Sequence, residues 1–208
     1  MMSAEATYRW LINCSARTAH DPFDIHVVAC IFALAISEAE ESGTEISNGI
    51  GLEGQPLLTI GGTLFPEARE FFDEHAGSGT SLLIDAEEQS VRDILGMFAS
   101  GASPLDLPLA AMIARRCKSP HHLWQDLGLP NRGDLTLLMQ RHFERLAAKN
   151  QHDMKWKKFL YRMVCGSEGF TICTSPVCSE CSDYHNCFGA EDGEARLHTL
   201  EVLGEHAG

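Results

Sequence analysis

Residues 21–36 read Asp-Pro-Phe-Asp-Ile-His-Val-Val-Ala-Cys-Ile-Phe-Ala-Leu-Ala-Ile, and this stretch decides the fold class of the chain. Asp21 has the side chain of a helix N-cap, and Pro22 suits the first helical position, where its missing N–H leaves no bond unmade. Apolar residues then cover most of the circumference of the expected helix. We therefore expect this helix deep in a bundle and interpret Cys30 within it as a small buried apolar residue.

Helical patterns also occur on both sides of this central segment, and no stretch shows several alternating strands. The chain is therefore predicted to be all-α, an irregular helical bundle that forms a single domain over residues 1–208 with a C-terminal cysteine-rich loop. The other helices are expected over residues 3–19, 65–75, 91–98, 106–117, 135–150 and 154–164, with a short helical turn at 123–127. The second of these begins near Pro66, and a capping box at Asp85 and Glu88 precedes the third. Gly166 is expected as the C-cap of the last.

One glycine-rich motif invites a functional reading. Residues 49–54 match G-x-G-x-x-G, the pattern of a dinucleotide-binding turn. That turn follows a strand and opens a long helix, whereas here no β-branched strand precedes the motif and Pro56 follows it. We interpret the motif as a glycine-rich loop between helices.

Composition and charge exclude several classes of function. The chain has 208 residues with 29 acidic and 16 basic side chains, a formal charge of -13, which disfavours nucleic acid as a partner. The N-terminal residues lack the pattern of a signal peptide, and the apolar run Ile25–Ile36 is too short to span a bilayer. We therefore expect a cytoplasmic protein without a membrane partner, whose eight cysteines are mostly thiols or thiolates.

Four cysteines form a compact array near the C-terminus. Cys173, Cys178, Cys181 and Cys187 follow the spacing C-x4-C-x2-C-x5-C, with Pro176 keeping the first spacer out of helix. Such a tight run resembles iron-sulfur spacing more than the two separated knuckles of a structural zinc site. Disulfides would need an oxidising compartment. The spacing favours an iron-sulfur centre and leaves zinc and disulfides open, in a metal-cluster loop predicted over residues 165–190.

Basic side chains precede this loop on the helix expected over residues 154–164. Lys155, Lys158 and Arg162 line one of its faces, joined by Lys157, while apolar residues line another. In so acidic a chain this basic face would stabilise an anionic cluster or an oxyanion, although an ordinary solvated surface fits the pattern equally well. Cys165 is either a fifth ligand or a spare thiol.

Three histidines are weaker candidates for the same chemistry. His121 and His122 are adjacent, and neighbouring helical residues diverge by about 100°, so we do not expect both on one metal. We expect a capped turn there, with at most one of the two histidines supporting a ligand. His142 shares the apolar stripe of its helix, and we interpret it as a core or boundary residue rather than a ligand.

Several motifs of the chain, among them the cysteine array, together resemble the NifQ family of nitrogen-fixation proteins. The resemblance is close over residues 107–197 and loose before them. Glu144 and Ala190 stand where the resemblance leads us to expect proline, but the four array cysteines are intact. The resemblance is carried by the cysteine array, Met154–Phe159 with Tyr161–Arg162, Cys187–Gly189, His121–Leu129 and Arg141–Phe143.

The resemblance implies a function for the array. It implies an iron-sulfur protein, not an enzyme, that carries molybdenum in a [4Fe-4S] or Mo-Fe3-S4 type cluster. Such a protein would donate molybdenum, taken up as molybdate or from another source, for iron-molybdenum cofactor synthesis on the NifEN scaffold with the NifH protein. Two other readings of the residues remain: a zinc-stabilised helical interaction module, and a simple [4Fe-4S] electron carrier.

Overall fold

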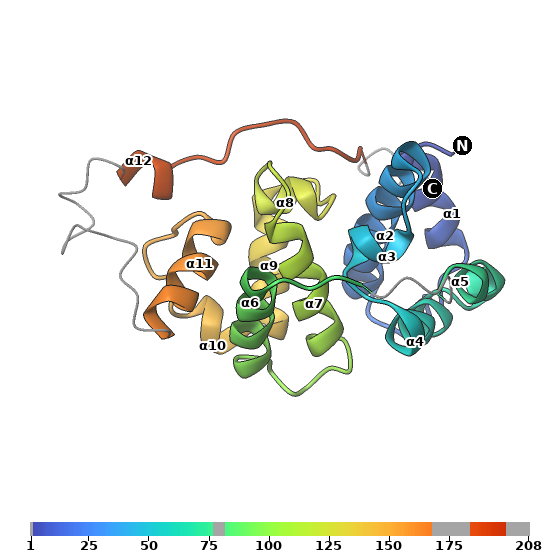
Figure 1. The fold of residues 1–208 in the computed structure, drawn as a ribbon, viewed down its shortest axis with the longest axis horizontal. Coiled ribbons are helices and arrows are strands. Elements are labelled where there is room, and N and C mark those ends of the chain that lie inside the picture. The colour runs from blue at the N-terminus through green and yellow to red at the C-terminus, as the bar shows by residue number, and fades with distance from the viewer. Residues whose placement is uncertain (1, 77–81, 168–183, 199–208) are drawn as a thin grey trace.

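The computed structural model describes residues 2–76, 82–167 and 184–198. It is all-α over these residues, with no strand among them, as predicted (Figure 1). The N-terminal helices are α1 (Ala4–Asn13), α2 (Pro22–Ser42), α3 (Ile46–Ile50), α4 (Gly54–Leu64), the 3₁₀ turn η1 (Pro66–Ala68) and α5 (Arg69–His75). The later helices are α6 (Ala86–Met97), α7 (Asp106–Cys117), α8 (Leu123–Asp126), α9 (Arg132–His142), α10 (Glu144–Ala147), α11 (Trp156–Ser167) and α12 (Tyr184–Cys187).

Helix α2 begins where the sequence predicts. Asp21 Oδ1 accepts a hydrogen bond from the Phe23 backbone N–H at 2.8 Å, and Pro22 occupies the first helical position. Gly43 ends the helix in the left-handed conformation with φ of 67°, which glycine adopts without strain. Local chemistry therefore defines both ends of this helix.

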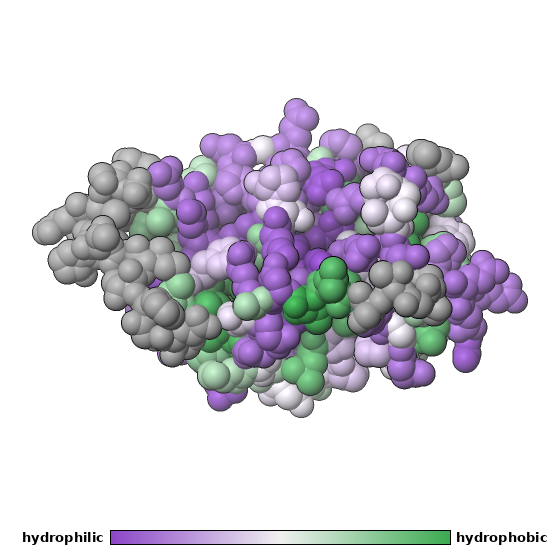
Figure 2. Space-filling view, in the orientation of Figure 1, coloured by the Kyte–Doolittle hydropathy of each residue, from purple (hydrophilic) through white to green (hydrophobic). Residues whose placement is uncertain are grey.

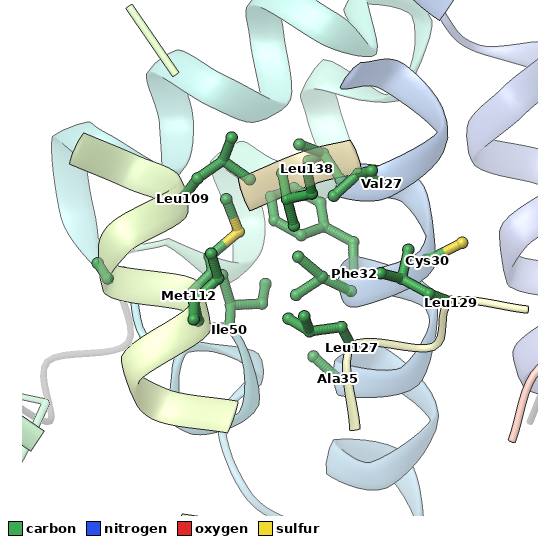
Figure 3. Close-up of a cluster of buried hydrophobic side chains, with 14 of the residues drawn as sticks. Val27, Cys30, Phe32, Ala35, Ile50, Leu109, Met112, Leu127, Leu129 and Leu138 are labelled. Atoms are coloured by element: carbon green, nitrogen blue, oxygen red, sulfur yellow. The ribbon is translucent and has the colours of Figure 1, made fainter. Parts of the chain in front are cut away.

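Helix α2 is the centre of the hydrophobic core. Nearly all residues from Ile25 to Ala35 are fully buried, Cys30 among them. Figure 3 shows side chains of α2 packed beside Leu109 and Met112 of α7 and near Ile50 of α3. Each fully buried side chain of this size contributes about 1.5–3 kcal/mol relative to exposure, so the α2 interface accounts for much of the stability.

The length of α2 raises the question of a membrane span. Its 21 residues are long and apolar enough to cross a bilayer. However, 72% of its most apolar 18-residue window is buried inside the protein. The surrounding helices explain its apolar composition, as for the core helix expected from the sequence.

The G-x-G-x-x-G motif has a packing role. Gly51 ends α3 with φ of 79°, and a Cβ there would lie 2.9 Å from the Ala111 carbonyl oxygen. Gly49 lies so close to α2 that a Cβ would come within 2.9 Å of the Ala35 Cβ. The loop is shorter than expected, because α4 already begins at Gly54. Pro56 lies in the first turn of α4, where the backbone N–H that proline lacks would have no helical partner.

Two other helix predictions need correction. The helix expected over residues 3–19 ends at Asn13. The single helix expected over residues 135–150 breaks at Phe143, which has φ of -138° and separates α9 from α10. The Ser100 backbone N–H donates to the His142 carbonyl at 2.8 Å, so a distant segment binds the chain at this break. Helix α10 begins at Glu144, the position where the resemblance predicts proline, a residue suited to a helix start.

The remaining differences lie at helix ends. Asp85 caps α6 by accepting from the Glu88 N–H at 2.9 Å, but Glu88 does not complete the capping box. Its buried carboxylate instead accepts from Arg92 at 2.6 Å and Arg115 at 3.2 Å. Gly166 is not a C-cap, because α11 continues to Ser167.

Candidate metal-cluster segment and its anchors

The cysteine-rich segment follows the end of α11, and the chain rejoins the helical body beside the start of the same helix. Of the array, Cys173, Cys178 and Cys181 lie outside the described residues. Cys187 ends α12 and is half-buried. Its carbonyl accepts a hydrogen bond of 2.9 Å from the backbone N–H of Lys155, the residue before α11. The helix that leads into the segment therefore begins where the array ends.

Helix α11 is held to the body by its apolar face. Trp156, Phe159, Leu160 and Val164 are buried as predicted, and α11 packs against α6. The indole Nε1 of Trp156 donates to Thr136 Oγ1 of α9 at 3.3 Å. This packing fixes the direction in which α11 presents its polar residues.

Lys157 does not join the predicted basic face. Lys155 is half-buried, and Lys158 and Arg162 are exposed. Lys157 points elsewhere, because its Nζ donates to Asp126 at 2.5 Å and to the Ser119 carbonyl at 2.6 Å. The face beside the array therefore consists of Lys155, Lys158 and Arg162, without Lys157.

Asp126 is an anchor that sequence reasoning missed. Its side chain is fully buried at the end of α8, where an unpaired carboxylate would be strongly destabilising. Besides Lys157, it contacts His121 Nδ1 at 3.0 Å and Arg196 Nη1 at 3.4 Å. One carboxylate thus joins α8, the helix that enters the cysteine segment and the chain that leaves it.

Residues 188–198 form a strap that runs from α12 across the top of α8 toward α2 (Figure 1). Apolar anchors hold both of its ends, since Phe188 and Leu197 are buried. Between them, the Gln125 side-chain amide donates to the Glu194 carbonyl at 2.8 Å. The strap is therefore built onto the body and fixes the position of Cys187 at its start.

Ion pairs add to this anchoring. Arg196 Nη2 lies 2.8 Å from Glu38 Oε1 of α2, and Glu38 in turn contacts the buried Arg116 at 2.7 Å. Glu191, whose side chain is 2% exposed, lies 3.5 Å from His122 Nδ1 and 3.4 Å from Arg132 Nε. Glu191 and Arg196 of the strap thus form structural contacts with α2, α8 and α9.

The paired histidines belong to these contacts. They precede α8, and His122 is its extended N-cap residue with ψ of 148°, so the helical argument for their divergence does not apply. The expected capped turn is present, with Leu123, Trp124 and Leu127 buried. Among the described residues, no group of three or more His, Cys, Asp or Glu side chains is arranged to hold a metal ion.

His142 is buried, which agrees with its interpretation from the sequence as a core or boundary residue. Its Nδ1 lies 2.8 Å from Asp106 Oδ1 and its Nε2 lies 3.2 Å from Asp24 Oδ1. Burial acts to lower the pKa of His142, but the hydrogen bonds and charges of the two carboxylates outweigh it and raise the pKa above its usual value. His142 thus links α2, α7 and α9, and the two carboxylates favour its protonated form.

The cysteines of the helical body do not have the character of metal ligands. Burial raises the pKa of Cys117 to about 12 and raises the pKa of Cys30 well above the usual thiol value. The pKa of Cys14 is raised for the same reason. Thiolates are the form that binds metals, so these three side chains remain neutral core thiols. Cys165 on α11 is half-buried, which leaves it and the array as the candidate donors.

The donor set fits a metal cluster rather than a hard cation. Four cysteine sulfurs within fifteen residues offer only soft ligands, which suit iron-sulfur clusters and zinc. The basic face described above begins beside Cys187, where the Lys155 backbone N–H donates to the Cys187 carbonyl. The ligand roles of the four cysteines stay a prediction from their spacing.

Comparison with known proteins identifies the family. The family model described as NifQ matches residues 27–189, which begin inside α2 and include the whole cysteine array. The chain belongs to the NifQ family.

Curated relatives agree with this membership. Membership of the family gives the protein a NifQ role in nitrogen fixation. A "Protein NifQ homolog" of Sinorhizobium fredii is 33% identical over 190 residues, covering 88% of this chain and 79% of the relative. "Protein NifQ" of Azotobacter vinelandii is 40% identical over 105 residues, covering 50% of this chain and 54% of the relative. "Protein NifQ" of Klebsiella pneumoniae is 42% identical over 107 residues, covering 50% and 64%. No solved structure matches the chain.

Proposed function

We infer that this NifQ-family protein carries molybdenum in an iron-sulfur cluster and donates it for the synthesis of the iron-molybdenum cofactor. The observation that carries this proposal is the four-cysteine array, whose last member is fixed against the start of the basic helix α11. The family match over residues 27–189 supports the link to nitrogen fixation.

The roles of the residues follow from their chemistry. Cys173, Cys178, Cys181 and Cys187 would hold the cluster, which is of the [4Fe-4S] or Mo-Fe3-S4 type. If only three thiolates bind iron, one corner stays open for molybdenum to enter and leave. The cluster is cargo that the protein passes on, so the protein is a carrier and not an enzyme.

The basic face has a separate role in this proposal. Lys155, Lys158 and Arg162 would attract molybdate or offset the negative charge of the cluster. Reversing all three charges to glutamate should lower molybdenum loading while circular dichroism stays that of the parent. The matched control reverses the exposed Arg9 and Arg69, which lie on α1 and α5. Equal loading of the triple variant and the parent would refute this role.

The recipient in this proposal is the NifEN scaffold, acting with the NifH protein in the cytoplasm. The test is a transfer experiment in which protein labelled with radioactive molybdenum is incubated with purified NifEN and NifH without oxygen. We expect the label to appear on NifEN and to disappear from the donor, and a Cys187→Ser variant to transfer little. Label that stays on the donor would contradict donation, and protein that never acquires label would contradict carriage.

A further inference from the structure

A hollow beside the cysteine-rich segment is left unexplained by the packing of the core. It has a volume of about 560 Å³ and lies between the end of α6, the turn at residues 149–154, α11 and the start of the strap. Gly166 and Phe188, from the chain entering and leaving the cysteine segment, both line it. Whatever occupies this hollow sits next to the segment that carries the array.

The floor of the hollow is apolar. Carbon-rich side chains of α6, α11 and the strap form most of it, and Met97 at its edge is 65% exposed. Met97 is the strongly exposed apolar side chain here; exposed apolar surface marks interaction sites, and methionine adapts its shape to a partner. In Figure 2 the visible face is mostly hydrophilic, but hydrophobic atoms emerge at the α10–α11 end. The floor residues are Ile94, Phe98, Met154, Phe159, Met163 and Phe188.

The rim of the hollow is basic, in contrast to the chain as a whole. Lys149, His152 and Arg162 line it, and no Asp or Glu does so among the described residues. Nearby Asp153 pairs with Arg132 at 2.7 Å and does not line the hollow. In a chain of net charge -13, such a rim would attract carboxylates and repel other basic surfaces.

Neighbouring cations extend this rim. Lys149 Nζ lies 5.6 Å from the centre of the Phe98 ring, and the Arg145 guanidinium lies 6.0 Å from it. Phe98 thus places two cations at the edge of an apolar surface. A small oxyanion would find donors at the rim, where Asn150 and Gln151 also line the hollow, but none on the apolar floor. A protein side chain flanked by acidic residues matches both the floor and the rim.

We propose that this hollow is the docking site for the protein that receives the cluster's molybdenum, which inserts an apolar side chain flanked by carboxylates. The proposal rests on the function inferred above and adds to it the surface and the chemistry of the partner. Docking here places the recipient beside both ends of the cysteine segment.

Two exposed positions allow a test that leaves the fold intact. Met97→Asp places a carboxylate at the edge of the floor, and Lys149→Glu reverses a charge on the rim. The matched controls are Leu83→Asp, where the side chain is 85% exposed, and Arg69→Glu, where it is 75% exposed in a surface pair with Asp73. Neither control residue lines the hollow.

The measurement is the Kd of each metal-loaded variant for immobilised NifEN, with molybdenum and iron per chain determined on the same samples. We expect Met97→Asp and Lys149→Glu each to weaken binding about tenfold, equal to about 1.4 kcal/mol, with unchanged metal content. The controls should stay within about twofold of the parent. Binding by the parent should weaken with salt, and Lys149→Glu should flatten that dependence.

Each other outcome overturns the docking site. Parent-like binding by both hollow variants would show that the recipient docks elsewhere, and equal losses in the controls would show non-specific attraction. Loss of metal from the hollow variants would assign the hollow to the cluster instead. A parent that carries molybdenum but does not bind NifEN would overturn both the docking site and donation to that scaffold, while carriage would stand.

Discussion

At the scale of single residues, the structure separates the basic side chains proposed to serve a cluster from one that holds the helices together. Lys155, Lys158 and Arg162 share one face of α11, whereas Lys157 turns inward to Asp126. Helical spacing places the first three on one face, and it does not show where the fourth cation points. A contact between α8 and α11 decides that one of them is structural.

The Asp126 contacts lead to a stability prediction. Asp126→Asn removes the charge shared by Lys157, His121 and Arg196 while keeping the side-chain size. Breaking a buried ion pair leaves its partner charges uncompensated, so the free energy of unfolding should fall by about 3 kcal/mol. Urea unfolding of metal-free protein measures this loss. The exposed Asp73→Asn, a member of a surface pair, serves as control and should change stability by less than about 1 kcal/mol.

A small effect of Asp126→Asn would show that the three cations find other partners. The same variant tests whether the anchor matters to the cluster, because Asp126 contacts both the entering helix and the strap. We expect metal bound to the variant to be lost faster to a chelator than metal bound to the parent.

His142 predicts a pH dependence of stability. Its folded-state pKa is raised, so its charged contacts with Asp24 and Asp106 stabilise the fold fully below the unfolded pKa of about 6.5. This stabilisation is lost as pH rises through the folded pKa. The difference in unfolding free energy between the parent and His142→Gln should therefore shrink from pH 6 toward alkaline pH.

The control for this comparison is His152→Gln, at an exposed position. Its difference from the parent should stay nearly constant over the same range. A parent advantage over His142→Gln that grows with pH would contradict the charged state assigned to His142.

At the scale of elements, α2 and the glycine motif show what could be predicted from sequence. Helix α2 carries its own cap, its proline and its apolar surface, so local chemistry defines it. The glycine motif lies between helices, as expected, but α4 was missed because Pro56 was taken as an obstacle to a helix. Proline in a first turn is no such obstacle.

The glycine motif allows a matched pair of substitutions. Gly51→Ala meets both a positive φ and a contact with the Ala111 carbonyl, so it should lower the free energy of unfolding by about 1–3 kcal/mol. Gly62→Ala in α4 has open space around the added Cβ, and alanine favours helix, so it should be neutral or stabilising by up to about 1 kcal/mol. Thermal unfolding of both variants provides the comparison, and equal effects would contradict the packing role of Gly51.

Other elements depend on partners distant in sequence. The break between α9 and α10 coincides with the bond from Ser100 to His142, which no local pattern contains. The positions of His121 and His122 likewise follow from Asp126 and Glu191. Periodicity predicted which residues are buried at these places but could not predict where the backbone turns.

At the scale of the whole molecule, a helical body built around α2 carries α11 and α12, the helices that flank the cysteine-rich segment, at its opposite end (Figure 1). Sequence predicted the all-α class, the apolar face of α11 and the neutral core cysteine Cys30. It did not predict the strap or the hollow, because both require segments that meet only after folding. The array itself was identified by spacing alone, and its ligand roles remain predictions.

The central claim is that the array holds a cluster containing molybdenum. The most direct measurement is the molybdenum, iron, zinc and sulfide content of protein purified without oxygen from molybdate-fed cells, with Cys178→Ser as the comparison. We predict molybdenum and several irons per chain in the parent, and loss of both in the variant. Zinc alone at one per chain, without iron or sulfide, would contradict the claim and make the array a structural zinc site.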